Sequence, residues 1–150
     1  RRQRQMCIRD RPRVVEGMWH TYLRVADAAQ ARVRGVRGAS WHNFATGDKG
    51  SFDANELAVT PDTDTVIQGV GPALALLDPA WGRQIHVETT GCPSAVVWNP
   101  RSSSTHADNP TAQAWRDFVC VETGACKDNA VIVAPHSDLT MSTRISVETL

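Results

Sequence analysis

The chain has 150 residues, of which 41% are hydrophobic and 21% are charged, so its length favours a single domain and its composition favours a folded chain over a disordered one. Its 16 basic and 16 acidic residues cancel, which leaves no overall charge for binding nucleic acid or an anionic membrane. No apolar stretch approaches the roughly 20 residues of a membrane-spanning helix. We therefore expect neither nucleic acid nor a membrane as a partner.

The first 11 residues, RRQRQMCIRDR, differ in charge from the rest of the chain. They hold five arginines and one aspartate, so 11 basic and 15 acidic residues remain beyond them, a net charge of −4. Such a head is typical of a disordered tail or of a nucleic-acid-binding arm. However, codons for residues 1–10 can spell a string that resembles the transposon-end adapter of sequencing libraries. We expect residues 1–11 to be a non-native head, and 12–150 to be the C-terminal part of one domain whose N-terminal part is missing.

Beyond this head, short β-like segments alternate with turn residues. About ten strands are expected, at residues 21–27, 30–36, 56–60, 64–70, 73–78, 83–90, 94–100, 116–124, 130–136 and 139–150. The spacing predicts an all-β protein, an antiparallel sandwich or barrel, with a loop over 38–55 and a polar loop over 101–113. One helical turn is predicted near 111–115. Long segments with a helical period are absent, which argues against alternating strands and helices.

The cysteines and most histidines show no metal-binding pattern. Cys92, Cys120 and Cys126 form no CxxC motif and have no histidine at zinc-ligand spacing, while Cys7 falls in the head. Cys120 lies in an apolar run, which is typical of a buried thiol. The spacing of metal ligands is also absent at His42, His86, His106 and His136. We therefore predict no metal site, and a reducing cytoplasm as the location.

Two residues stand out as candidates for acid–base chemistry. Glu122 sits in the apolar run DFVCVETG, and in an ideal strand it shares one face with Phe118 and Cys120. A carboxylate on an apolar face is a general-base candidate, although an outward-facing residue of an alternating strand is the simpler interpretation. His20 opens a strand beside Trp19, a position more often occupied by a structural histidine than by a catalytic one.

Two further residues have a structural and a functional interpretation. Asp64 begins a predicted strand, where aspartate is often only a turn residue. Trp98 ends a strand in VVWNP and serves either as a core residue, which is favoured, or as a platform on which a sugar stacks. The serines of RSSST lack the glycines of a nucleophile elbow.

Four stretches in order resemble one enzyme family. EGMWHTYLRVADAAQARVRGVRG, PDTDTVIQG, GRQIHVETTGCPSAVVWNP and RDFVCVETGACKDNAVIVAP are similar to motifs of the hexose-6-phosphate mutarotases, the glucose-6-phosphate 1-epimerase branch of the aldose 1-epimerase family. The resemblance covers about residues 16–147, the C-terminal half of a family member. It implies a truncated galactose-mutarotase-like supersandwich, an antiparallel β-sandwich that binds sugar on a concave sheet face.

The resemblance also assigns roles to residues. The family's catalytic histidine falls on His20, its catalytic glutamate on Glu122 and its sugar-contacting aspartate on Asp64. The chain departs from the family at Arg101, which replaces a tryptophan, and at His136, which replaces a glycine. We expect His20 and Glu122 to bracket one sugar ring, with Asp64 on the rim of the same surface.

The implied function is interconversion of the α and β anomers of a hexose 6-phosphate or another aldose. Glu122 would act as the base and His20 as the acid, with no cofactor. The family's second active-site histidine and its basic phosphate ligands belong to the N-terminal half, so we expect this chain alone to be a weak enzyme. The alternatives are a non-catalytic carbohydrate-binding β-sandwich module and a structural β-domain without a ligand. The latter predicts that His20 and Glu122 lie far apart.

Overall fold

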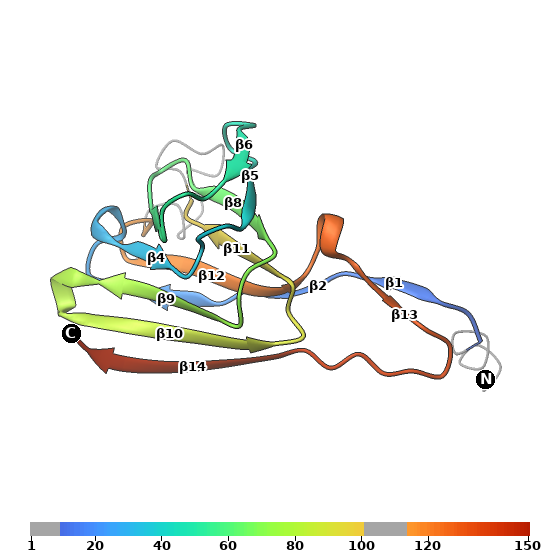
Figure 1. Cartoon of the computed structure of the whole chain (residues 1–150). Helices are drawn as coiled ribbons and strands as arrows, with labels where there is room; N and C mark the ends of the chain where they lie inside the picture. Colours follow the sequence, from blue (N-terminus) through green and yellow to red (C-terminus); the bar gives the residue numbers. More distant parts are fainter. Residues whose placement is uncertain (1–9, 101–113) are drawn as a thin grey trace.

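The computed structural model describes residues 10–100 and 114–150, which form two antiparallel sheets packed face to face and a separate two-stranded ribbon (Figure 1). The five-stranded sheet has the order β14 (Ser142–Thr149), β10 (Arg83–Thr90), β9 (Ala73–Asp78), β4 (Arg32–Arg34) and β7 (Glu56–Ala58). The seven-stranded sheet has the order β2 (Gly17–Trp19), β12 (Phe118–Ala125), β11 (Ser94–Trp98), β8 (Asp64–Gln68), β5 (Ser40–Asn43) and β6 (Lys49–Ser51), and β3 (Tyr22–Arg24) also pairs with β12. Three short 3₁₀ helices, η1 (Ala28–Gln30), η2 (Pro79–Trp81) and η3 (Lys127–Asn129), lie in connections.

The core lies between the two sheets. Alternation along β8, β11 and β12 sends every second side chain into it, because successive residues of a strand point to opposite faces. The inward set from these strands includes Ile67, Val97, Val119 and Val121, each no more than 1% exposed. The five-stranded sheet supplies an opposing set of Val33, Leu74, Leu76, Ile85 and Val87. This burial holds the two sheets together and leaves the opposite face of β8, β11 and β12 free to carry polar groups.

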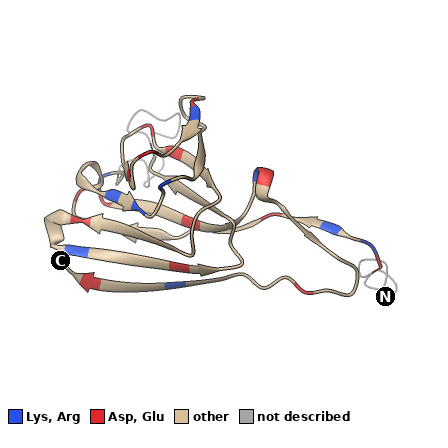
Figure 2. Ribbon diagram, in the orientation of Figure 1, with Lys and Arg blue, Asp and Glu red and all other residues tan. Residues whose placement is uncertain are grey.

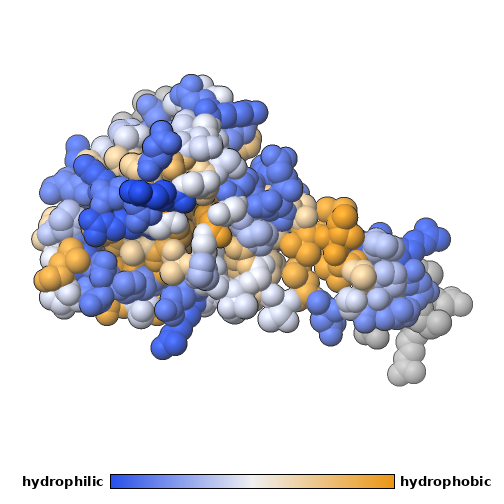
Figure 3. Space-filling model, viewed as in Figure 1, coloured by the Kyte–Doolittle hydropathy of each residue, from blue (hydrophilic) through white to orange (hydrophobic). Residues whose placement is uncertain are grey.

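The ribbon of β1 (Arg13–Val15) and β13 (Val131–Val133) projects away from the sandwich (Figure 1). Its outer side chains Val14 and Ile132 are each 70% exposed, and Figure 3 shows hydrophobic surface gathered over it. Of the predicted head, only Asp10 and Arg11 fall among the described residues. The Oδ1 atom of Asp10 lies 3.7 Å from the Nε2 atom of His136.

The all-β prediction is confirmed, and each of the ten predicted segments overlaps a strand. The predicted loop over 38–55 is wrong, because it contains the hairpin of β5 and β6, whose strands are short and rich in polar residues. Strands β1 and β2 were not predicted either, since three residues are too few to show alternation. The predicted polar loop over 101–113 lies outside the described residues, as does most of the helical turn predicted near 111–115, and residues 114–116 form a turn. Within the described ranges, no helix has the length and apolar character needed to cross a bilayer.

Candidate active site

The outward face of the seven-stranded sheet carries the predicted site residues in two adjacent rows. In the first row, strand pairing places Asp64 of β8 opposite Trp98 of β11, Trp98 opposite Cys120 of β12, and Cys120 opposite Tyr22 of β3. Paired residues project on the same side of a sheet, so these four side chains share a face. Glu122 lies in the next row along β12.

His20 reaches this face from the connection between β2 and β3. Both strands pair with β12, β2 at Ala125–Thr123 and β3 at Cys120–Phe118, so the two residues between them pass beside Glu122. The His20 Nε2 atom lies 3.2 Å from Glu122 Oε1. The imidazole is half exposed, at 49%, whereas the carboxylate is buried, at 8%. The structure therefore brings together the two residues that the sequence singled out, which argues against a structural domain in which they lie apart.

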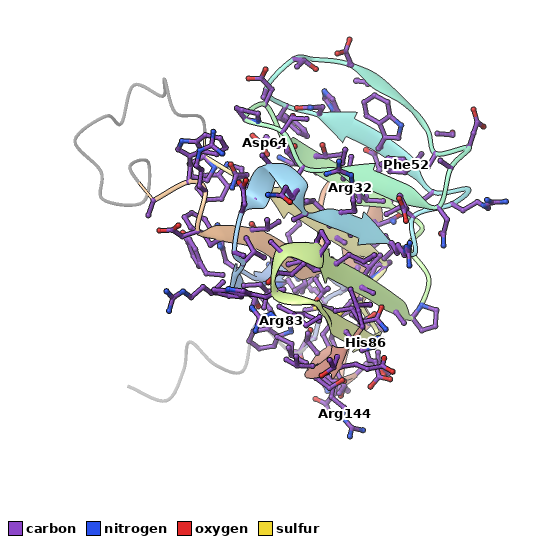
Figure 4. All side chains as sticks on the ribbon, turned by 90° about the vertical axis from the view of Figure 1, so that its left-hand side faces the viewer. Arg32, Phe52, Asp64, Arg83, His86 and Arg144 are labelled. Atoms are coloured by element: carbon purple, nitrogen blue, oxygen red, sulfur yellow. The ribbon has the colours of Figure 1, made fainter. Side chains whose placement is uncertain are left out.

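Burial dominates the electrostatics of this pair. It raises the pKa of Glu122, the His20 imidazole opposes that rise, and the nearby Asp64 carboxylate adds to it. Burial also raises the pKa of Asp64, and the Lys127 ammonium opposes this shift. The two acids thus lie close enough to interact, with Asp64 at the side of the site nearest Lys127. Figure 4 shows Asp64 far from His86 and Arg144, which belong to the five-stranded sheet.

Aromatic side chains form a wall around His20. The imidazole stacks on Tyr22, with ring centroids 4.9 Å apart and planes 21° apart, and meets the edge of Trp98 at 5.8 Å. Phe118 packs against both Tyr22 and Trp98. The favoured assignment of Trp98 to the core is therefore wrong: its strand parity places it on the outward face, half-buried beside His20.

A pocket of about 390 Å³ lies on the same sheet face, beyond Asp64. Its lining includes Lys49, Lys127, Phe44, His42 and Asp128. The Lys127 Nζ lies 5.3 Å from the centre of the Phe44 ring, which places the cation over an aromatic face. Figure 2 shows blue and red segments on the connection between β12 and β13, where η3 carries Lys127 and Asp128. The pocket therefore contains the aromatic ring of Phe44 and the ammonium groups of Lys49 and Lys127.

One further arrangement was not predicted. The donor atoms of His20, Cys120 and Glu122 all lie within 4.8 Å of one another. No zinc-like spacing reveals this cluster in the sequence, because His20 comes from a distant connection and meets β12 only through strand pairing. The prediction that Cys120 is a buried thiol is confirmed. His42 lines the neighbouring pocket, and His106 lies outside the described residues.

Comparison with known proteins finds similarity to proteins that are named as sugar epimerases. No protein-family model matches it. A curated protein of Cenchrus ciliaris named "Putative glucose-6-phosphate 1-epimerase" is 26% identical over 109 residues, which cover 71% of this chain and 33% of that protein. The chain therefore spans about a third of the length of this curated relative.

Solved structures show the same fold. The crystal structure of a "putative mutarotase" from Salmonella typhimurium superposes with a TM-score of 0.79 at 20% identity, over 93% of this chain and 47% of that one. A "Putative aldose 1-epimerase" of Escherichia coli K12 gives a TM-score of 0.64 at 19% identity, over 94% and 53%. A galactose mutarotase-like protein of Clostridium acetobutylicum gives 0.55 at 8% identity, over 94% and 49%.

The chain thus covers about half of each of these folds. It has the galactose mutarotase-like β-sandwich architecture, and part of its sequence is similar to the curated glucose-6-phosphate 1-epimerase relative.

Proposed function

We propose that this chain carries the acid–base pair of a mutarotase that interconverts the α and β anomers of an aldose, with a hexose 6-phosphate as the preferred substrate. The observation that carries the proposal is the contact of His20 Nε2 with Glu122 Oε1 at 3.2 Å, on a sheet face walled by aromatic rings. Such rings are suited to the apolar faces of a sugar, and buried carboxylates with a shifted pKa gather at functional sites.

The short separation fits the reaction better than the bracketing arrangement expected from the sequence. The anomeric hydroxyl and the ring oxygen of a pyranose are bonded to the same carbon, so an acid and a base that serve them must be neighbours. A ring cannot lie between two groups 3.2 Å apart, so the sugar would lie over the pair. Its hydroxyl and ring oxygen would then replace the contact between His20 and Glu122.

In the proposed reaction, Glu122 takes the proton of the anomeric hydroxyl while His20 donates a proton to the ring oxygen. The bond between C1 and the ring oxygen breaks, which gives the open-chain aldehyde. After rotation about C1–C2, the ring oxygen attacks the other face of the carbonyl carbon. His20 recovers its proton from that oxygen, and Glu122 returns its proton to the former carbonyl oxygen, which becomes the new anomeric hydroxyl. Each positioned acid or base typically contributes about 10²–10⁴-fold to the rate.

The phosphate preference draws on the pocket beyond Asp64 as well as on the curated relative's name. Lys49 and Lys127 line this pocket, against one carboxylate, Asp128. A phosphate binds ammonium groups through charge-assisted hydrogen bonds. The family resemblance leads us to expect the basic phosphate ligands in the N-terminal half of a family member, whereas Lys127 would provide one within this chain.

The test is NMR exchange between the anomers of glucose and of glucose 6-phosphate, with and without the chain, together with the affinity of each sugar. The proposal expects exchange faster than in buffer, higher affinity for the phosphate ester, and loss of exchange in His20→Asn. Binding of both sugars without faster exchange would instead identify a carbohydrate-binding module, and equal affinities would remove the phosphate preference.

A further inference from the structure

We propose that His20, Cys120 and Glu122 form a binding site for a thiophilic divalent cation, Zn²⁺ above all, whose occupancy blocks the acid–base pair. The inference depends on the proposed function only for its inhibitory consequence, because the site itself is defined by donor atoms. These are an imidazole nitrogen, a thiol sulfur and a carboxylate oxygen, all within 4.8 Å of one another.

The donor set matches the coordination chemistry of zinc. Zinc binds cysteine sulfur at about 2.3 Å and histidine nitrogen or carboxylate oxygen at about 2.0–2.2 Å, so its ligands lie a few ångströms apart around one ion. Hard cations such as Mg²⁺ prefer sets made entirely of oxygen, and the sulfur disfavours them. Three protein ligands leave a fourth position, open to water or to a hydroxyl of a sugar.

The backbone holds two of the ligands in place. Cys120 and Glu122 are alternate residues of β12, so both project on the outward face of a strand that is buried along its whole length. His20 faces them from a connection tied to β12 on both sides by β2 and β3. The imidazole is half exposed and is the point of entry for an ion, whereas Cys120 forms the buried floor.

Binding of the metal ion releases a proton and prevents His20 and Glu122 from acting as acid and base. The thiol of Cys120 loses its proton to solvent, and its sulfur takes up the metal as a thiolate. The carboxylate of Glu122 and one nitrogen of His20 give lone pairs to the same ion. Neither group is then free to move a proton, so the metal and mutarotation exclude each other.

The experiment is a titration of the chelator-treated 150-residue chain with Co²⁺, followed by displacement with Zn²⁺. A thiolate ligand gives a sulfur-to-cobalt charge-transfer band, which reports the site whether or not the chain turns over sugar. Cys120→Ala and Cys120→Ser remove the sulfur. Cys126→Ala removes another buried thiol and Cys7→Ser the thiol of the head, as matched controls. Circular dichroism checks the fold of every variant.

We expect the band in the wild type and in both controls, its loss in both Cys120 variants, and weaker binding in Glu122→Gln. Groups that only hydrogen-bond to a metal ligand change metal affinity by roughly 10–100-fold, so loss of a ligand itself should cost at least as much. A band that survives in folded Cys120→Ser, or no band in the wild type, would overturn the proposal. If the band appears but the chain shows no anomer exchange, the metal site stands and the proposed enzyme function fails.

Discussion

The carboxylate of Glu122 sits where a folded chain would ordinarily place a neutral group. Its side chain is 8% exposed, and the imidazole of His20 meets it from the more open side. A buried charge is costly unless it is paired, and a single half-exposed partner offsets only part of that cost. Glu122 is therefore a residue that the fold retains at the expense of stability, as is common at functional sites.

This cost gives a pH-dependent prediction for stability. The folded-state pKa of Glu122 is raised, mainly by burial, so folding is less favourable when this carboxyl group is ionised than when it is protonated. Its favourable contribution is present at low pH and is lost as the pH rises through the folded-state pKa. Glu122→Gln should therefore be more stable than the wild type at neutral pH, and this advantage should shrink as the pH falls. Urea unfolding at several pH values measures it, and an advantage that grows toward low pH would contradict the assigned shift.

Lys127 gives a second testable prediction. Its ammonium group lies over Phe44 in the pocket beyond Asp64. Because Lys127→Gln removes this charge, it should weaken binding of glucose 6-phosphate by about tenfold and leave glucose binding unchanged. Isothermal titration with both sugars measures the difference. Arg144→Gln removes a cation from the other sheet and should change neither affinity. Equal losses for both sugars would show that Lys127 supports the pocket's shape instead of binding the phosphate.

At the scale of elements, the site depends on how closely β2 approaches β12. A Cβ atom added at Gly124 of β12 would lie 2.0 Å from the carbonyl oxygen of Gly17 and 2.9 Å from the Cα of Met18. Both contacts are with the backbone of β2, which leads directly into His20. Any side chain at position 124 must therefore push β2 away from β12, and His20 with it.

Gly124→Ala should thus lower both the free energy of unfolding and the anomer exchange rate. Overpacking of this kind typically costs about 1–3 kcal/mol. Gly71→Ala is the matched control, because a Cβ there meets nothing within 4 Å, and it should leave both quantities unchanged. Urea unfolding and NMR exchange measure the two effects. A Gly124→Ala chain as stable and active as the Gly71→Ala chain would contradict the described approach of the strands.

The elements also show what a sequence can predict and where it fails. Strands β9 and β10 match their predicted ranges residue for residue, because their alternation is long and regular. The parity of β12 correctly placed Glu122 on the face of Phe118 and Cys120. The hairpin of β5 and β6 has no apolar alternation, since its strands are mostly exposed or half-buried. With it, the sequence reading missed the part of the pocket that carries Lys49.

Contacts between segments far apart in the sequence could not be predicted from residue patterns. The distance from His20 to Glu122 depends on the pairing of β2 and β3 with β12, about 100 residues later in the chain. The family resemblance indicated the pair of His20 and Glu122, and the structure shows that the two side chains are in contact. The stacking of Tyr22 on His20 and the position of Trp98 follow from the same pairing and had no separate signal in the sequence.

At the scale of the whole molecule, the chain corresponds to 47% of the Salmonella structure that it resembles. His20, Glu122 and the aromatic wall around them all lie within it. We expect it to be a weaker catalyst than a complete mutarotase fold, because misplacement of a substrate can cost orders of magnitude in rate even when the acid and base remain.

The most direct test is the rate of anomer exchange of glucose 6-phosphate, followed by NMR, in the wild type, Glu122→Gln and Glu88→Gln. Glutamine keeps the shape of the side chain and cannot take a proton, so Glu122→Gln should lower the catalysed rate by about 10²-fold or more and leave sugar binding nearly intact. Glu88→Gln alters an exposed carboxylate on the other sheet and should match the wild type. Exchange in Glu122→Gln at the wild-type rate, or a wild-type rate no faster than in buffer, would contradict the account.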